Sequence, residues 1–382
     1  MLNIPLSGIK KIEAIAQSSD EYISLSQGAL KIGGIPKQIK KHLQEILITD
    51  KTDYYQSAWG IIELRKKLSQ ILSKQHSTKI SANQIIITHG CIGGLSTLLF
   101  TILDKGDQII LPEPTYPAYE KLALLVRAEP VFISCINKNS KNKNLFQFNI
   151  EKIKKATTSK TKVIIFSNPW NPLGIIISKK EILELLDWCE KNKIYLIIDE
   201  AYKDYCFDNT FESVIPLINQ SEFIIEVSSF SKSMGMSGWR IGYIVTHPNL
   251  CEQMGKTQDA ILNCPNVPSQ YAVFYALNYP QFTDQFYKII KSNFDLSIQT
   301  LAPLVKEKIF NIQKPSGGFF LFLKTEIKDA TDLCMNILSK AKVSLVPGKF
   351  FGPSGSPFLR LCYAREQKVL MQGLDRLIKF FL

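Results

Sequence analysis

One lysine of this chain stands in a setting that suits covalent chemistry. Lys232 lies among serines in Ser228-Ser-Phe-Ser-Lys-Ser233, and a glycine-rich loop then leads to Arg240. The apolar run Phe223–Ser228 precedes the lysine and predicts a strand buried on both faces. A lysine just past such a strand can form an imine with an aldehyde, and an arginine and hydroxyls beside it can bind a phosphate. The alternative is an exposed turn in which Lys232 and Arg240 are solvated.

Polar side chains also follow other apolar runs. Asp199 ends the run Ile194–Asp199, and Tyr202 comes shortly after it. Asn171 lies in the segment Ser167-Asn-Pro-Trp-Asn-Pro-Leu-Gly174, which follows a further run. A carboxylate that closes a buried strand needs a cationic partner, because burying it unpaired costs several kcal/mol. Capping of a following helix is the alternative role for Asp199.

Two of these segments together resemble a known enzyme family. The Ser-x-Ser-Lys and Gly-x-Arg-x-Gly elements of residues 229–242 and the Asn-Pro-rich segment of residues 167–174 are similar to those of the class I/II aminotransferases. These are fold-type I enzymes that use pyridoxal 5'-phosphate, and the resemblance covers roughly residues 20–380. It implies that Lys232 carries the cofactor as a Schiff base and serves as acid and base in catalysis.

The resemblance also implies roles for residues around the cofactor ring. Asp199 would pair with the ring nitrogen and keep the ring an electron sink. Asn171 and Tyr202 would bind the phenolate oxygen of the ring, and Tyr116 would stack on the ring, with core packing as its alternative role. Backbone N–H groups at a helix N-terminus bind phosphate, and His89-Gly-Cys-Ile-Gly-Gly94 opens a predicted helix. The expected phosphate-binding residues are Gly90, Cys91, Ile92, Ser229, Ser231 and Arg240.

Further residues are implied for the substrate and for a second subunit. Arg360 would grip the α-carboxylate of the substrate, since a guanidinium binds a carboxylate with two hydrogen bonds. Gly28 and Asn171 would line the substrate site. Tyr55 would reach the cofactor phosphate of the neighbouring subunit, which implies a homodimer. A structural ion pair is the alternative for Arg360, and an ordinary exposed turn is the alternative for Tyr55.

Apolar runs and helical patterns alternate from residue 84 onward. The strand-like runs are 84–88, 108–111, 130–133, 162–167, 194–199, 223–228 and 240–246. This alternation predicts an α/β fold with a mostly parallel, doubly wound sheet, and a smaller α+β region closes the chain. We expect an N-terminal arm over residues 1–40 that packs with the small domain, a large cofactor-binding domain over 41–282 and a small domain over 283–382.

Composition argues against several other functions. The chain has 382 residues and a formal net charge of +12, which can indicate nucleic-acid binding. The lysines are interspersed with Glu and Asp along helical stretches, however, so we favour a solvated surface and expect no nucleic-acid partner. The scattered cysteines form no Cys-x-x-Cys pair, so we expect no metal site. We also expect no membrane span and no secretory signal, and therefore a cytoplasmic protein.

The predicted reaction is transamination from an L-amino acid to a 2-oxo acid, such as 2-oxoglutarate or pyruvate, by a ping-pong mechanism. A carbon–sulfur β-lyase shares all the residues named above and is one alternative. A transcription regulator that senses pyridoxal phosphate is another, but such proteins carry an added DNA-binding domain. Here family motifs already occupy part of the segment before the sheet, which argues against the regulator.

The glycine-rich turn bears on substrate choice. Aspartate- and prephenate-type members of the family carry a lysine in this turn, and the matching position here is Ile92. We therefore expect aromatic, aliphatic or sulfur-containing substrates to be favoured over acidic ones. An aspartate-type aminotransferase stays the alternative, because a basic residue from the arm or from the partner subunit can replace that lysine.

Overall fold

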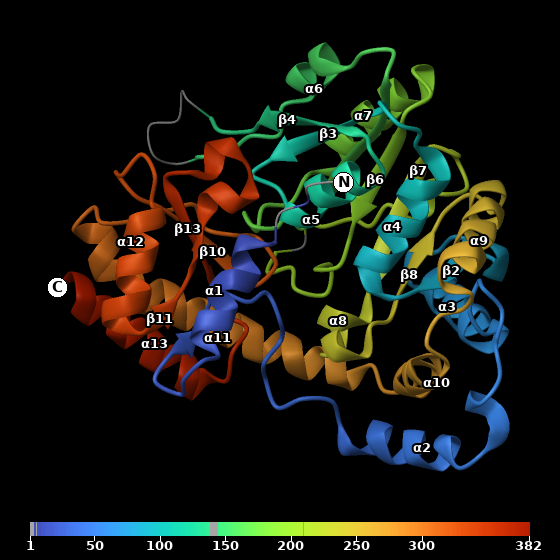
Figure 1. The fold of residues 1–382 in the computed structure, drawn as a ribbon, viewed down its shortest axis with the longest axis horizontal. Helices are drawn as coiled ribbons and strands as arrows, with labels where there is room; N and C mark the ends of the chain where they lie inside the picture. Colours follow the sequence, from blue (N-terminus) through green and yellow to red (C-terminus); the bar gives the residue numbers. More distant parts are fainter. Residues whose placement is uncertain (1–3, 5, 138–143, 209) are drawn as a thin grey trace.

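A sheet of seven strands forms the centre of the molecule (Figure 1). The computed structural model describes residue 4 and residues 6–137, 144–208 and 210–382. Across the sheet the strands follow the order β2-β8-β7-β6-β5-β3-β4. They are β2 (Ile85–Thr88), β3 (Gln108–Glu113), β4 (Glu129–Ser134), β5 (Thr161–Ser167), β6 (Tyr195–Asp199), β7 (Ile224–Ser229) and β8 (Gly242–Val245).

The large sheet is mostly parallel, as the alternation of strands and helices predicted. Only β8 runs against its neighbours, antiparallel to both β2 and β7. At the ends of the central strands, Ser167 pairs with Asp199 and Asp199 pairs with Val227. The carboxyl ends of the parallel strands therefore lie along one edge, which is where ligands bind in open α/β sheets.

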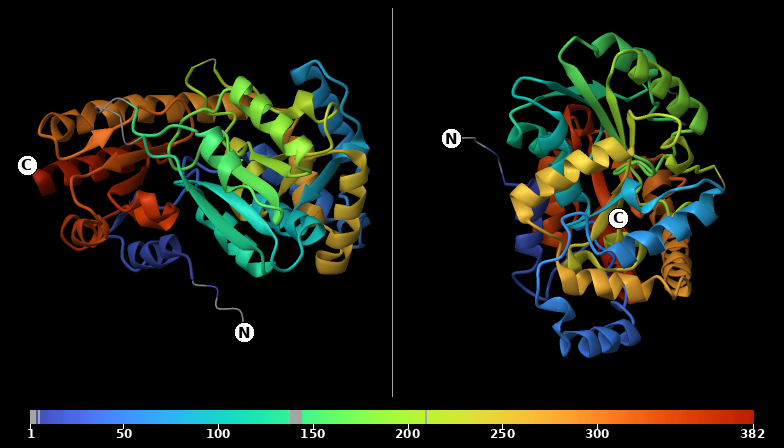
Figure 2. Two further views of the ribbon diagram at one scale, coloured as in Figure 1. Left: turned by 90° about the horizontal axis from the view of Figure 1, so that it is seen from above. Right: turned by 90° about the vertical axis from the view of Figure 1, so that its right-hand side faces the viewer.

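Helices cover both faces of this sheet (Figure 2). Successive strand side chains point to opposite faces, so Ile85 and Ile87 pack in one hydrophobic core and Ile86 in another. The first core is covered by α2 (Lys37–Leu47), α3 (Ile62–His76), α6 (Ile150–Ala156), α7 (Lys179–Lys191) and α10 (Val267–Ala276). The second is covered by α4 (Gly90–Ile102), α5 (Pro117–Leu125) and α9 (Pro248–Leu262).

A smaller sheet, in the order β12-β13-β10-β9, has its own hydrophobic core. Its strands are β9 (Asn311–Ile312), β10 (Phe320–Lys324), β12 (Val346–Pro347) and β13 (Phe358–Cys362). The helices of this core are α11 (Gln281–Lys306), α12 (Thr331–Asn336) and α13 (Gln367–Phe381).

The N-terminal arm joins the smaller core, so the first helix of the chain and the last helix contribute to the same core (Figure 1). Its elements are α1 (Gly8–Ala16) and β1 (Ile23–Ser24), and β1 pairs in parallel with β11 (Val343–Ser344). The division of the chain at residues 40 and 282 into an arm, a large domain and a small domain remains a proposal.

Some features of the fold differ from the sequence-based expectation or add to it. The helix after β2 begins at Gly90, within the glycine-rich segment that was expected to open it, because glycines weaken a helix without preventing a first turn. Within the described ranges, we find no helix long and apolar enough to cross a membrane. The eight cysteines are all unpaired thiols, and the described residues contain no group of His, Cys, Asp and Glu that could hold a metal ion.

Candidate active site

A cavity of about 750 Å³ lies at the carboxyl edge of the large sheet. Its walls come from strand ends of the large sheet, from β13 of the smaller sheet and from the N-terminal arm. The sequence-predicted residues that line it are Gly28, Cys91, Ile92, Tyr116, Asn171, Asp199, Tyr202, Ser229, Ser231, Lys232, Arg240 and Arg360. The fold thus brings together residues from segments far apart in the chain.

One part of the cavity gathers donors suited to an anion. The N–H groups of the first turn of α4, which begins at Gly90, have no partners inside the helix. The Nη2 atom of Arg240 lies against this turn, and a Cβ at position 90 would approach it to 2.7 Å. Gly90 also has a φ of +71°, so glycine permits both the turn and the close approach of the guanidinium. Ser229, which caps α8 (Phe230–Ser233), and Ser231 line the same cavity.

Lys232 lies in the short helix α8, directly after β7. Its Nζ donates a hydrogen bond to the carbonyl of Gly28 and lies 5.9 Å from the ring centroid of Tyr202 and 5.8 Å from that of Phe319. Burial lowers the pKa of this amine to about 8. About a tenth of the amine is therefore uncharged at pH 7, far more than for an ordinary lysine, and the uncharged form is the one that acts as a nucleophile or a general base.

Asp199 ends β6 and is 5% exposed. Its Oδ2 accepts a hydrogen bond from Oη of Tyr119 at 2.9 Å, and its Oδ1 accepts one from the backbone N–H of Ala201 at 3.0 Å. Burial raises the pKa of this carboxyl above its ordinary value, and the two hydrogen bonds oppose the rise. The direct donors to Asp199 are thus neutral groups, which leaves its charge to be met by a ligand.

Asn171 links two other residues of the site. Its Nδ2 donates to Oη of Tyr202 at 3.5 Å, and its Oδ1 accepts from Nη1 of Arg360 at 3.3 Å. Its backbone N–H donates to Oγ of Ser167 at 2.9 Å, which holds it beside the end of β5. Tyr202 is fixed in turn by the ring of Phe319, which it meets edge-on at 5.0 Å. The amide of Asn171 is therefore oriented from several sides.

Arg360 is buried without a complete set of partners. Only 2% of its surface is exposed, and its guanidinium carbon lies 4.3 Å and 4.7 Å from the ring centroids of Phe320 and Phe351. Its Nη2 donates to the carbonyl of Ser26 at 2.7 Å, but its Nε has no hydrogen-bond partner. Burial lowers the pKa of this guanidinium below its ordinary value. Because an unsatisfied buried donor costs free energy, this guanidinium is suited to a ligand carboxylate.

The remaining lining includes residues that the sequence analysis did not anticipate. They are apolar and basic side chains from the arm and from α5: Ile4, Ile9, Lys10, Lys121, Leu122 and Leu125. Tyr116 precedes α5, and its ring lies 5.5 Å from that of Tyr119 in an edge-on arrangement. The Tyr116-x-x-Tyr119 spacing was a signal for the second tyrosine, whereas nothing local in α1 predicts that it reaches this cavity.

Two predicted residues do not line the cavity. Gly90 lies behind it, against Arg240. Tyr55 lies outside it, in the irregular segment before α3, and the residue is 83% exposed. The role of Tyr55 toward a partner subunit therefore remains a proposal.

The residues present fit pyridoxal 5'-phosphate, the cofactor that the resemblance implies. The first turn of α4, the hydroxyls of Ser229 and Ser231 and the guanidinium of Arg240 supply donors for a phosphate. Asp199 is a buried carboxylate whose direct donors are neutral, and a protonated ring nitrogen would complete it. Lys232 supplies an amine of lowered pKa.

Known proteins of similar sequence agree with this chemistry. The family model described as aminotransferase class I and II matches residues 20–377. An aspartate aminotransferase of Sulfolobus acidocaldarius is 28% identical over 333 residues, which cover 85% of this chain and 82% of the relative. A (5-formylfuran-3-yl)methyl phosphate transaminase of Methanocaldococcus jannaschii is 29% identical over 388 residues, covering 100% of this chain and 98% of the relative.

Solved structures show the same fold. The crystal structure of an aspartate aminotransferase from Thermotoga maritima superimposes with a TM-score of 0.89 at 26% identity, covering 99% of this chain and 98% of that one. The fold-type I architecture expected from the sequence is thus confirmed over nearly the whole chain.

Proposed function

The chain belongs to the class I and II aminotransferases, and from this premise we propose that it transfers the amino group of an L-amino acid to a 2-oxo acid by a ping-pong mechanism. Arg360 carries the proposal, because it is a buried guanidinium with an unsatisfied Nε in the cavity that also contains Lys232 and Asp199. Such a group suits a carboxylate, which amino acids and 2-oxo acids share. One cavity can then bind the two substrates in turn.

Lys232 has the central chemical role in this proposal. When bound, pyridoxal phosphate supplies an aldehyde that takes up an amino group and a ring that withdraws electrons from the bond that breaks. The Nζ of Lys232 would hold the cofactor. The same amine, when free, would take the proton from the substrate α-carbon. A base works best when its pKa is near the working pH, and the pKa of about 8 for Lys232 meets this condition.

Other residues position the reacting groups. Arg360 and Asn171 bind the α-carboxylate, and their mutual hydrogen bond at 3.3 Å aligns them before the substrate arrives. Asp199 would keep a proton on the ring nitrogen of the cofactor, because a buried carboxylate favours a cationic partner. Tyr202 would donate to the phenolate oxygen of the ring, and Tyr116 would stack on the ring.

For the substrate side chain, we propose an aromatic, aliphatic or sulfur-containing group. Ile9, Ile92 and Leu122 line the cavity, and burying one large apolar side chain contributes about 1.5–3 kcal/mol. Aspartate is the second candidate, because Lys10 and Lys121 also line the cavity and several relatives are named aspartate aminotransferases. Ion pairs near the surface contribute only about 0–1 kcal/mol, so the apolar lining has the larger effect.

A single-turnover screen tests this proposal. The cofactor-loaded protein is mixed with one amino acid at a time, without a 2-oxo acid, and the absorbance of the bound cofactor is followed. We expect phenylalanine, methionine and leucine to react about 10-fold faster than aspartate, and Ile92→Lys to reverse this order. Faster reaction of the wild-type protein with aspartate would replace the proposal with an aspartate-type enzyme. Release of pyruvate and ammonia from cystathionine would favour the β-lyase.

The proposed active unit is a homodimer in which the partner's Tyr55 completes the phosphate site. The high exposure of Tyr55 in a single chain supports this assignment. Sedimentation should then give twice the 43.3 kDa mass of one chain. Tyr55→Phe should weaken cofactor binding about 10-fold, as expected for loss of a hydrogen bond to a charged group. Tyr54→Phe is the control, because Tyr54 is an exposed neighbour on the same segment. A fully active monomer would contradict the proposal.

A further inference from the structure

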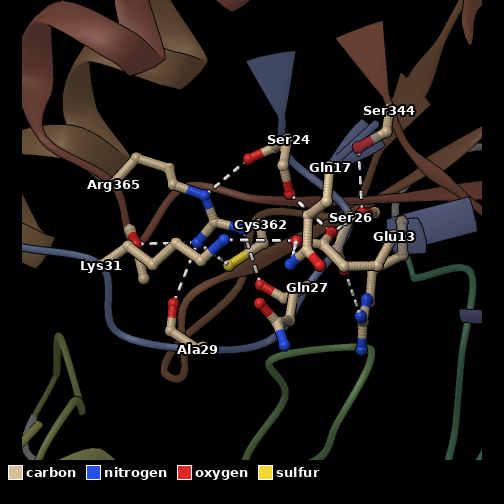
Figure 3. Close-up of polar contacts among 12 residues, drawn as sticks. Glu13, Gln17, Ser24, Ser26, Gln27, Ala29, Lys31, Ser344, Cys362 and Arg365 are labelled. Atoms are coloured by element: carbon tan, nitrogen blue, oxygen red, sulfur yellow. Dashed lines mark hydrogen bonds and ion pairs between the residues drawn. The ribbon is translucent and has the colours of Figure 1, made fainter. Parts of the chain in front are cut away.

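The helix α1 carries a buried carboxylate, Glu13, which is 3% exposed. It accepts hydrogen bonds from Oγ of Ser24 at 2.7 Å, Oγ of Ser26 at 2.7 Å, Nζ of Lys31 at 3.2 Å and Nε2 of Gln17 at 3.0 Å (Figure 3). Burial alone raises the pKa of a carboxyl, but the bonds from Ser24, Ser26 and Lys31 outweigh it and hold the pKa of Glu13 below its ordinary value. Glu13 is therefore a charged group with a nearly complete set of donors.

Arg365 also binds the arm, at residues 24–29 (Figure 3). It is 2% exposed, and its guanidinium donates to the backbone carbonyls of Ser24 at 2.6 Å, Gln27 at 2.7 Å and Ala29 at 2.9 Å. Its remaining acceptors include the carbonyl of Ala364 and Sγ of Cys362. Backbone carbonyls of residues 24–29 thus stabilise the positive charge of Arg365, and these hydrogen bonds hold the backbone of residues 24–29 in place.

Two other carbonyls of residues 24–29 accept hydrogen bonds from side chains of the active site. The carbonyl of Ser26 accepts from Nη2 of Arg360 at 2.7 Å, and the carbonyl of Gly28 accepts from Nζ of Lys232. Arg365 therefore binds residues 24, 27 and 29, while the catalytic cavity uses residues 26 and 28. A shift of the stretch would move the acceptor that orients Arg360.

We propose that Glu13 and Arg365 are positioning residues that fix residues 24–31 so that the carbonyl of Ser26 holds Arg360 ready for the substrate α-carboxylate. The inference rests on the proposed role of Arg360. The guanidinium of Arg360 lies against the rings of Phe320 and Phe351, and its hydrogen bonds are those to Ser26 and Asn171, because its Nε has no partner in the structure. A carboxylate-binding fork needs its geometry held within about 0.5 Å, so a looser Ser26 carbonyl weakens binding.

A purely structural role for Glu13 makes a different prediction. If Glu13 only holds α1 against the smaller core, its substitution would lower the melting temperature and would affect the binding of all ligands alike. Positioning of Arg360 acts on the binding of a carboxylate. The distinguishing readout is therefore the affinity for a simple carboxylate, measured apart from turnover.

The test uses Glu13→Gln in the cofactor-loaded protein, with 3-phenylpropanoate as an unreactive probe that has a carboxylate but no amino group. Calorimetry should show about 10-fold weaker binding of the probe, as for a weakened hydrogen bond to a charged group. The KM for the amino acid should rise in parallel, with kcat changed less than about 2-fold, because the lost interaction is made equally in the ground and transition states. Glu21→Gln is the control, since Glu21 is an exposed arm carboxylate that pairs with Lys342 at 3.4 Å; it should bind the probe like the wild type.

A double-mutant cycle separates the two roles. Arg360→Lys alone should weaken probe binding, and Glu13→Gln should add little in that background, because residues that act through one another are not additive. Additive losses would overturn the inference. If Arg360→Lys binds the probe like the wild type, the proposed role of Arg360 itself fails. If Arg360→Lys binds the probe weakly but Glu13→Gln binds it like the wild type, the proposed function stands and the positioning role of Glu13 fails.

A milder variant covers the case in which Glu13→Gln does not fold. Ser26→Ala removes the hydroxyl that donates to Glu13 and leaves the backbone carbonyl in place. It should weaken probe binding about 3-fold, in keeping with loss of one modest hydrogen bond. Unchanged probe affinity in Ser26→Ala would then overturn the inference.

Discussion

Lys232→Ala is expected to lower the rate of transamination by at least about 10⁴-fold, the upper range for loss of a general acid–base group. In the proposed mechanism, the variant lacks both the attachment point of the cofactor and the base that takes the α-proton. The other lysines that line the cavity, Lys10 and Lys121, belong to α1 and α5 rather than to the ends of the central strands. They are therefore not placed to take over its role.

Two measurements check this expectation. Borohydride reduction of the wild-type protein should attach the cofactor irreversibly to the peptide that contains Lys232, as mass spectrometry would show. Added methylamine should restore part of the activity of Lys232→Ala, because it can supply a base in the vacated space. Lys256→Ala is a suitable control, since Lys256 is exposed on α9 and pairs with Glu252 of the same helix. A Lys232→Ala protein that still transaminates without added amine would contradict the assignment.

The pH dependence of cofactor loading gives an independent readout of the same residue. Only the uncharged amine attacks an aldehyde, and burial lowers the pKa of Lys232 to about 8. The loading rate of the cofactor-free protein should therefore rise with pH and level off above about pH 8. An unshifted lysine, with a pKa near 10.4, would still show a rising rate at pH 10.

The central sheet and the core of the site could be predicted from the sequence because their signals are local. Buried parallel strands appear as continuous apolar runs, and the chemistry-bearing residues follow directly where those runs end. Asp199 and Lys232 each stand at such a point, at β6 and just past β7. The chain order of strands and helices then places both at one edge of one sheet.

The contacts that complete the site could not be predicted in the same way, because they join distant segments. Arg365 binds the carbonyl of Ser24, which is 341 positions away in the chain, and Glu13 is buried only because the arm folds against the smaller core. A periodic pattern in α1 indicates a helix but carries no information about which core it joins. The antiparallel insertion of β8 between β2 and β7 is likewise a matter of long-range pairing.

Asp199→Asn should reduce transamination by about 10²–10⁴-fold, since removing one member of a buried ion pair costs about 3–5 kcal/mol. The amide has almost the same shape and can still accept from the N–H of Ala201, which now bonds Oδ1 at 3.0 Å. It cannot hold a proton on the ring nitrogen by charge. Borohydride should still attach the cofactor to Lys232, because Asp199 has no part in that bond, and methylamine should not rescue this variant.

Although Asp199→Asn should lower activity, it should raise the stability of the cofactor-free protein. Burial raises the pKa of Asp199 in the folded chain above its ordinary value of 3.8. Between the unfolded and folded pKa values the folded state binds more protons, so its stability falls as the pH rises through that window and is lowest at neutral pH. Asp199→Asn removes this penalty. The cofactor-free variant should therefore melt at a higher temperature than the cofactor-free wild type at pH 7, and should gain less on loading.

Together these results would separate an electrostatic role from a packing role for Asp199. If the carboxylate served mainly to cap the segment after β6 and to hold Tyr119, the amide would preserve most of its contacts and turnover would stay near that of the wild type. A melting temperature that falls in the cofactor-free Asp199→Asn protein would point the same way, because it would mean that the charge stabilises the fold on its own. Only lost turnover combined with a more stable cofactor-free protein fits a carboxylate whose partner is the bound ring.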